Sequence, residues 1–190
     1  MAGTLAAKFV SMQSAKPKNV TKTLLDTAHS GKRFVRKIGD PQWWEFDFTT
    51  PPLTYAQALE LFAFVCSQGG QYGTFYVPNP FPTIAQNLAA RVAPNIAIGA
   101  DSFVLSASNY MAGDFIQFSS HDKTYLVTNV NESTVNFYPK LKAAVGAASP
   151  IKYGKDVLFK VALQNDENDL LVKATNGKYT EVKLDVVEDI

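Results

Sequence analysis

One stretch of forty residues, Pro41 to Pro80, constrains the fold more than any other part of the chain. It reads PQWWEFDFTTPPLTYAQALELFAFVCSQGGQYGTFYVPNP and contains a strand pattern, a helix pattern and a second strand pattern. From Trp43 to Thr50 bulky apolar residues alternate with polar ones, which indicates a strand with one buried and one wet face. Pro51 and Pro52 end this strand, because proline has no N–H to donate to a neighbour.

A capped helix is predicted next. Thr54 and Gln57 have the spacing of a capping box, and apolar residues then recur at helical intervals, which predicts an amphipathic helix over 55–68 packed on a sheet. Gly69 and Gly70 end the helix, because glycine tolerates the left-handed conformation found after many helices. A further strand is expected over 72–77. We expect the core to hold a set of aromatic side chains from the predicted strands and helix: Trp44, Phe46, Phe48, Phe62, Phe75 and Phe159.

The segment before Pro41 is interpreted as a strand over 31–38, paired with the 43–50 strand through a turn at Gly39-Asp40-Pro41. The surrounding sequence, 16–37, is basic. It could contact a nucleic acid or an acidic partner. The simpler interpretation is an exposed strand face whose lysines discourage pairing with other chains.

Three aromatic residues are expected on the strand faces opposite the core: Trp43, Tyr72 and Tyr76. Aromatic side chains in such positions suit a subunit interface, where they are enriched. A second packed layer would explain them equally well.

The pattern changes after Val77. Residues 81–97 are rich in proline and are interpreted as a connector, and four short β-like runs then follow between 102 and 139, which is typical of a small barrel or sandwich. Longer alternating strands return at 157–163 and 182–186, with Asn176-Gly177 as a hairpin-turn signal. We expect these strands to join the first sheet, so that 1–80 and 154–190 form one domain and 98–153 an inserted one. The predicted fold class is therefore mainly β (α+β), with one packed helix.

Composition argues against several classes of function. Eighteen basic and seventeen acidic residues give a net charge of +1, so electrostatics does not favour nucleic acid or an anionic membrane as the main partner. No window approaches the ~18–20 apolar residues of a membrane span, and the N-terminus lacks the features of a signal peptide. We expect a product made in the cytoplasm without membrane insertion.

The reactive residue types form no recognisable constellation. The single cysteine, Cys66, is expected to be a buried structural thiol, and His29 and His121 have no spacing for zinc. No serine lies in a G-x-S-x-G motif, and the acidic run 165–169 lacks the glycine and late glutamate of an EF-hand. We therefore expect no catalytic residue, no metal and no cofactor, and the chain is not expected to be an enzyme.

The 31–80 block resembles a segment of minor tail proteins of long, non-contractile-tailed bacteriophages. In those proteins a W-x-F-x-(F/V)-x-x-P-P-L strand precedes a helix and a G-Q-x-G-T-F strand. The matching residues here are Trp44, Phe46, Phe48, Pro51, Pro52 and Leu53, followed by Gly70, Gln71, Gly73, Thr74 and Phe75. The runs MAGDFIQFSSHDKTYLVTNV, PKLKAAVGAASPI and TEVKLDVVEDI are also similar, so the likeness covers roughly 31–187.

The resemblance implies a distal tail protein, with a belt domain made of a β-sandwich and a helix, and a small β-barrel inserted in it. Such proteins form a homohexameric ring at the tail tip. Implied partners are further copies of the chain, the tail tube protein and tail-tip or hub proteins, with DNA only in transit through the channel. The implied location is the virion. The first thirty residues match nothing in the family and are interpreted as a first strand and an arm that reaches a neighbouring subunit.

Two alternatives remain open. The inserted module could bind host-surface carbohydrate, with Tyr110, His121 and Tyr125 as candidates because aromatic faces stack on sugars. A connector at the head–tail joint would have the same composition as a tail-tip ring.

Overall fold

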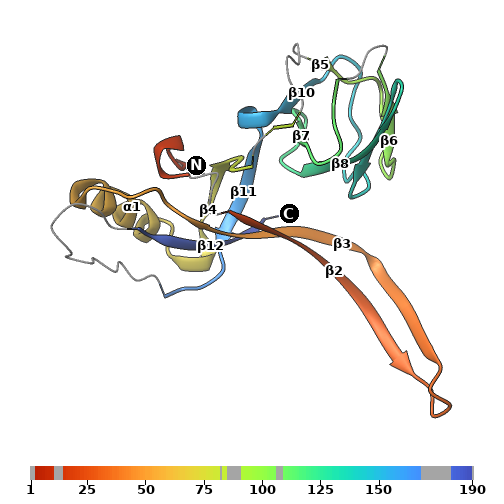
Figure 1. The fold of residues 1–190 in the computed structure, drawn as a ribbon, viewed down its shortest axis with the longest axis horizontal. Coiled ribbons are helices and arrows are strands. Elements are labelled where there is room, and N and C mark those ends of the chain that lie inside the picture. Colours follow the sequence, from red (N-terminus) through yellow and green to blue (C-terminus); the bar gives the residue numbers. More distant parts are fainter. Residues whose placement is uncertain are drawn as a thin grey trace.

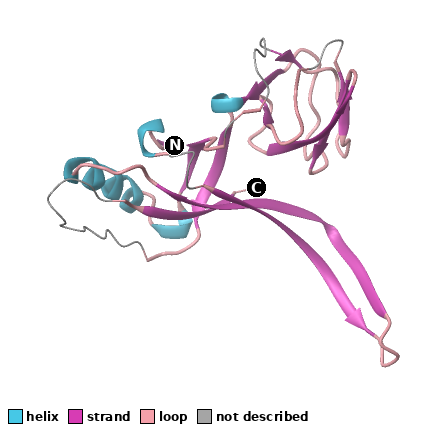
Figure 2. Cartoon of the chain, in the orientation of Figure 1, coloured by secondary structure: helices cyan, strands magenta, loops and turns pink. Residues whose placement is uncertain are grey.

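The chain is described by a computed structural model that covers residues 3–10, 15–81, 83–84, 91–105, 109–167 and 181–189. These residues form two six-stranded sheets and one α-helix (Figures 1 and 2). The expected fold class, mainly β with a single packed helix, is confirmed.

The first sheet combines strands from both ends of the chain. β1 pairs in parallel with β4, and the other neighbours are antiparallel. In spatial order its strands are β1 (Gly3–Thr4), β4 (Thr74–Pro78), β11 (Leu158–Leu163), β12 (Lys183–Glu188), β3 (Arg33–Thr49) and β2 (Lys16–Thr27). The expected union of the C-terminal strands with the first ones is therefore observed.

Helix α1 (Tyr55–Ser67) begins and ends where its sequence signals lie. The Thr54 side chain accepts from the N–H of Gln57, and the Gln57 side chain accepts from the N–H of Thr54. Gly69 and Gly70 follow the helix with φ values of 66° and 70°, a conformation that glycine adopts at no steric cost. Short 3-10 helices lie at η1 (Ala7–Phe9) and η2 (Gly70–Tyr72).

The first core lies between α1 and the sheet. Five of the six aromatic side chains expected there are buried in it: Trp44, Phe46, Phe48, Phe75 and Phe159. The sixth, Phe62, is half-buried and lies outside this cluster. The buried stripe of α1 runs through Ala58, Leu61 and Val65, and Phe62 lies one residue, about 100°, around the helix from it.

The second sheet is built from residues between β4 and β11, which pair with each other in the first sheet. The first sheet with α1 is called the first unit, and the second sheet with its connecting loops is called the second unit. All its pairs are antiparallel, and it has a separate core around Phe118, Tyr125 and Phe137. Its strands in spatial order are β5 (Arg91–Val92), β10 (Pro150–Tyr153), β7 (Phe115–Phe118), β8 (Thr124–Asn131), β9 (Thr134–Tyr138) and β6 (Ser102–Val104). A 3-10 helix, η3 (Gly154–Asp156), leads back to β11.

Two details of the second sheet differ from the sequence interpretation. β5 and the bridge between Ile96 and Val145 lie in the stretch interpreted as a connector, so part of 81–97 belongs to this sheet. β5 and β6 end the sheet, and no pairing between described residues joins them.

The predicted turn at Gly39-Asp40-Pro41 is wrong. β3 runs unbroken from Arg33 to Thr49 and pairs with β2, and the actual turn lies at 28–32. Four residues of β3 stand opposite a single residue of β2 between the Thr21–Gln42 and Thr23–Lys37 pairs. The Gly-Asp-Pro signal therefore marks a bulge, a position that tolerates the missing N–H of proline. The predicted turn at Asn176-Gly177 lies outside the described residues.

Candidate interaction surface

The most exposed part of the molecule is an arm formed by β2 and the first half of β3. β2 and β3 form one edge of the first sheet, and their turn end projects beyond its other strands and away from the second sheet (Figure 1). At roughly 3.4 Å per residue, the twelve residues of β2 span about 40 Å. Eleven of these residues are exposed and Val20 is half-buried. The N–H of Ala28 donates to the carbonyl of Lys32 at 2.9 Å and closes the turn, in which Gly31 has a φ of 80°.

The tip of the arm carries four apolar side chains in solvent. Leu25 lies opposite Val35 on one face, and Leu24 and Phe34 lie on the other. Their exposed fractions are 54% for Leu24, 53% for Leu25, 48% for Phe34 and 63% for Val35. An isolated two-stranded hairpin is marginally stable in water, and grouped exposed apolar side chains mark interaction sites. We identify this arm tip, 23–27 with 33–37, as the candidate interaction surface.

These four residues were not among those predicted at an interface from the sequence. Their signal is present, because Leu24-Leu25 and Phe34-Val35 are adjacent apolar pairs with polar or charged residues on either side. An adjacent pair places one apolar side chain on each face of a strand. That pattern does not fit a strand with one buried face.

Basic side chains surround the arm. The Lys22 ammonium lies 5.6 Å from the centre of the Trp43 ring, and the Lys32 ammonium lies 5.5 Å from the Phe34 ring. Both distances suit a cation–π contact. Segment 16–37 contains seven basic residues and one acidic residue, Asp26, so the arm combines apolar and positive character.

The three aromatic residues predicted at an interface lie apart. Trp43 is half-buried at the base of the arm and donates from Nε1 to Glu45 at 2.9 Å. Tyr72 is 95% exposed. The Tyr76 hydroxyl donates to Asp122 at 3.2 Å and so contacts the turn between β7 and β8 within the same chain. Of the three, Tyr72 is the most accessible to a partner.

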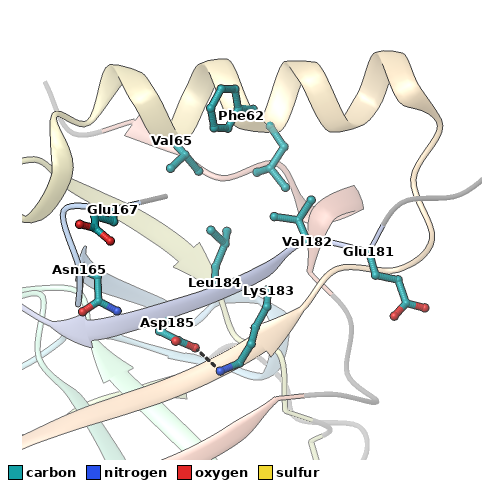
Figure 3. A pocket seen from close by; sticks show the side chains of 10 residues that line it. Phe62, Val65, Asn165, Glu167, Glu181, Val182, Lys183, Leu184 and Asp185 are labelled. Atoms are coloured by element: carbon teal, nitrogen blue, oxygen red, sulfur yellow. Dashed lines mark ion pairs between the residues drawn. The ribbon is translucent and has the colours of Figure 1, made fainter. Parts of the chain in front are cut away.

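A groove lies between α1 and β12 at the other end of the first sheet (Figure 3). Its volume is about 340 Å³. Its floor is made of buried core side chains, with Val65 of α1 facing Leu184 of β12 and Val182 just before it, and half-buried Phe62 also lines it. Glu167 and Glu181 lie at opposite ends of the groove (Figure 3). Lys183, which also lines the groove, pairs with Asp185 at 2.9 Å.

An aromatic cluster joins the two sheets. Phe115 of the second sheet belongs to the first core. Its ring lies 5.4 Å from Trp44, 5.4 Å from Phe159 and 5.2 Å from Phe81, between ring centres. These separations suit edge-to-face and stacked contacts.

A buried polar network completes this joint. The Lys123 ammonium of the second unit pairs with Glu188 of β12 and donates to the Gln42 carbonyl at 3.0 Å. Glu188 also accepts from the N–H groups of Trp44 at 3.1 Å and Thr124 at 3.2 Å. Burial lowers the pKa of Lys123 and raises the pKa of Glu188, because both charged forms lose hydration, and the attraction between the charges opposes both shifts. The second unit is thus fixed to the first sheet by apolar and ionic contacts.

Gln117 of β7 extends this joint. Its amide donates to the carbonyl of Leu158 at 3.0 Å and accepts from the N–H of the same residue at 3.2 Å. The side chain therefore pairs with the start of β11 as a neighbouring strand would.

The three residues considered for carbohydrate binding do not expose ring faces on which a sugar could stack. Tyr110 and Tyr125 are buried in the second core, so their ring faces cannot stack on a sugar. His121 is half-buried, and its Nε2 lies 2.8 Å from the Tyr125 hydroxyl. Burial lowers the pKa of His121 and raises the pKa of Tyr125 to about 12.

Other chemical features of the described residues are few. Cys66 is exposed, contrary to the prediction, because it lies next to Val65 on the helix and outside the buried stripe. Within the described ranges, no group of three or more His, Cys, Asp or Glu side chains could hold a metal ion. No helix in that part of the chain is long and apolar enough to cross a membrane.

Comparison of the sequence with protein-family models and with curated proteins gives no match.

Proposed function

We propose that the chain is a structural virion protein of a long, non-contractile phage tail, and that it forms a ring between the tail tube and the tail tip. The first unit acts as the belt-type β-sandwich domain, with α1 as part of its second layer, and the second unit is a small barrel. The partners are further copies of the chain, the tail tube protein and the tail-tip proteins. The resemblance of 31–187 to minor tail proteins supports this proposal.

The observation that carries the proposal is the arm. A hairpin with both faces in solvent and four apolar side chains at its tip gains stability only when another surface covers it. Subunits of closed rings need such a surface, because each copy must contact its neighbour through two different patches. The joint between the sheets also suits a ring subunit. Because buried contacts hold the second unit, it keeps one orientation in every copy of the ring.

The test is the mass of the purified chain in solution, measured by light scattering over a concentration series, with negative-stain images of the same samples. Six copies of a 20.8 kDa chain give about 125 kDa, and we expect this mass together with closed six-fold rings. A chain that stays monomeric at every concentration, or that forms open filaments, would contradict the ring.

The same purified chain separates the alternatives. Binding to a glycan array would favour host recognition. Tail tube protein and head–tail joint protein are then added to the ring separately. Retention of the tail tube protein alone would favour a tail-tip ring, and retention of the head–tail joint protein would favour a connector.

A further inference from the structure

Helix α1 lacks the charged outer side that a surface helix normally has. Among its thirteen residues only Glu60 is charged, and the Glu60 carboxylate pairs with the Lys8 ammonium at 2.7 Å. The helix already buries one apolar stripe in the first core. A helix that is apolar on further sides as well is usually covered there too. The outer side of α1 is therefore a candidate contact surface.

The uncharged residues on this outer side are all in solvent. They recur at intervals of three and four, which places them on one side of the helix. They are Tyr55, Ala56, Leu59, Ala63 and Cys66, and each of them is exposed; together they are called the outer α1 face. The two largest, Tyr55 and Leu59, have exposed fractions of 61% and 42%. Unlike the core side chains on the floor of the α1–β12 groove, these side chains are accessible to a partner.

The C-terminal end of α1 favours a cation. The last turn of the helix has no basic side chain, so its own side chains do not offset the partial negative charge of the helix C-terminus. Just beyond the helix, the exposed carboxylate of Asp166 accepts from the N–H of Gln71 at 2.9 Å. The helix end and the carboxylate thus add negative charge at the same place.

One face of the arm tip has the complementary features. Leu25 lies opposite Val35, and Arg33 lies on the same face as Val35, because strand side chains alternate. All three side chains are exposed. The other face of the arm carries Asp26 opposite Phe34, and this acid would be repelled by the negative end of α1. The Leu25–Val35 face therefore matches α1 better, because it combines apolar side chains with a cation.

The distribution of charge along the chain favours the same contact. Segment 16–37 holds seven basic residues and one acidic residue, so eleven basic and sixteen acidic residues remain elsewhere. A basic arm is therefore attracted to the rest of another copy, whereas two arms repel each other.

The positions of the two surfaces decide which α1 the arm can reach. The arm tip and α1 lie at opposite ends of the molecule (Figure 1), so the tip cannot cover the α1 of its own chain. A contact between two different patches leaves a pair of copies with one arm and one helix still free. Repetition of that contact closes into a ring when the rotation between copies allows it.

We propose that the Leu25–Val35 face of the arm docks on the outer α1 face of a second copy of this chain, with Arg33 at the C-terminal end of that helix. The inference rests on the proposed ring function, and it names the contact that closes the ring. Each copy gives one arm and receives another, so that the exposed apolar side chains on both surfaces become covered.

A double-mutant cycle in the full-length chain tests whether the two faces meet. Ala63→Lys and Val35→Glu each place a charge inside the apolar contact, and we expect each to weaken self-association by at least about tenfold. The combined variant brings opposite charges together and should associate more tightly than either single variant. Ala63→Lys with Leu24→Glu is the matched control, because it places the acid on the other face of the arm, and it should show no such recovery. Light scattering over a concentration series measures the association, and circular dichroism shows whether the fold is retained.

The native thiol gives an independent readout, because Cys66 lies on the outer α1 face near the helix C-terminus. Val35→Cys supplies a second thiol, and mild oxidation should then give a ladder of covalent oligomers. The same variant with Cys66→Ser should give dimers at most, since one thiol per chain cannot link more than two copies. Leu24→Cys, on the other face of the arm, should give a weaker ladder than Val35→Cys.

The outcomes separate the inference from the function. Rings that form with unchanged affinity in Ala63→Lys and Val35→Glu overturn the contact between arm and helix and leave the ring function standing. Weakened association without recovery in the combined variant also counts against this pairing of faces. A wild-type chain that never associates overturns both the contact and the ring. Recovery in the combined variant, with a ladder that requires Cys66, supports the contact.

Discussion

Loss of the Lys123 ammonium should destabilise the chain strongly, because it leaves Glu188 charged inside the joint. Both side chains are almost fully buried, with 4% and 1% of their surface exposed. Two backbone N–H groups would still donate to the carboxylate, but no cation would remain beside it. Breaking a buried pair in this way costs about 3–5 kcal/mol. With a urea dependence of roughly 2 kcal/mol per molar, Lys123→Met should lower the unfolding midpoint by about 2 M.

The pH dependence of that loss has a definite sign. Without Lys123, the pKa of Glu188 rises further above its value in the unfolded chain, so the folded variant binds more protons than the unfolded one. The loss of unfolding free energy caused by Lys123→Met is fully present above the raised pKa of Glu188. It becomes smaller as the pH falls from 7 toward 5, because Glu188 then takes up a proton in the folded variant. The difference in unfolding midpoint between variant and wild type should therefore be smaller at pH 5 than at pH 7.

Two further variants control this experiment. Lys160→Met removes the partner of Asp189 at a half-exposed pair of 2.8 Å, and a pair near the surface is worth less than about 1 kcal/mol. Lys123→Met with Glu188→Gln removes both charges and keeps an oxygen acceptor, so it should recover at least half of the lost stability. Urea unfolding followed by tryptophan fluorescence measures all of them. A loss below about 1 kcal/mol for Lys123→Met, or an equal loss at both pH values, would refute the reasoning.

Three further changes test the first unit. Trp44→Ala removes a buried aromatic ring and should cost about 3–5 kcal/mol in urea unfolding; a variant as stable as wild type would show that the ring is not part of the core. Thr54→Ala removes the helix cap and should cost about 1 kcal/mol, measured by the same method. Gly73→Ala places a Cβ 2.1 Å from the carbonyl oxygen of Gln68 and should destabilise by about 1–3 kcal/mol. Gly146→Ala, whose Cβ would have its nearest neighbour at 4.0 Å, is the control and should stay within about 0.5 kcal/mol of wild type.

Local signals predicted the helix and most strands because the residues that decide them are close in sequence. The capping box at Thr54 and the glycines after α1 act within one turn of the helix. The alternation in 43–50 and 157–163 reports which face of each strand is buried, so it also predicted most of the aromatic core.

The arm was only partly predictable. The Gly-Asp-Pro sequence at 39–41 carries a stronger turn signal than 28–32, yet the partner strand continues past it and converts it to a bulge. Which strand pairs with which depends on contacts between distant residues, and local turn chemistry does not report them. The expectation of a first strand and an arm in the first thirty residues rested on no turn signal, and the resemblance, which covers 31–187, does not include them.

The joint could not be predicted from the sequence at all. Lys123 and Glu188 are 65 positions apart, and each lies in a segment where a charged residue would ordinarily face solvent. Their burial follows from the packing of the second unit against β3 and β12, which brings the two charges together.

The two chain crossings between the units also decide how the molecule carries mechanical load. The crossings leave the first sheet side by side, since Pro78 at the end of β4 is paired with Leu158 at the start of β11. A force that pulls the second unit away would therefore peel these two strands apart one hydrogen bond at a time, which is the weakest direction for a sheet. The Phe115 ring and the Glu188 carboxylate attach the second unit at β3 and β12 as well. We therefore expect tension on the second unit to be shared across four strands instead of two.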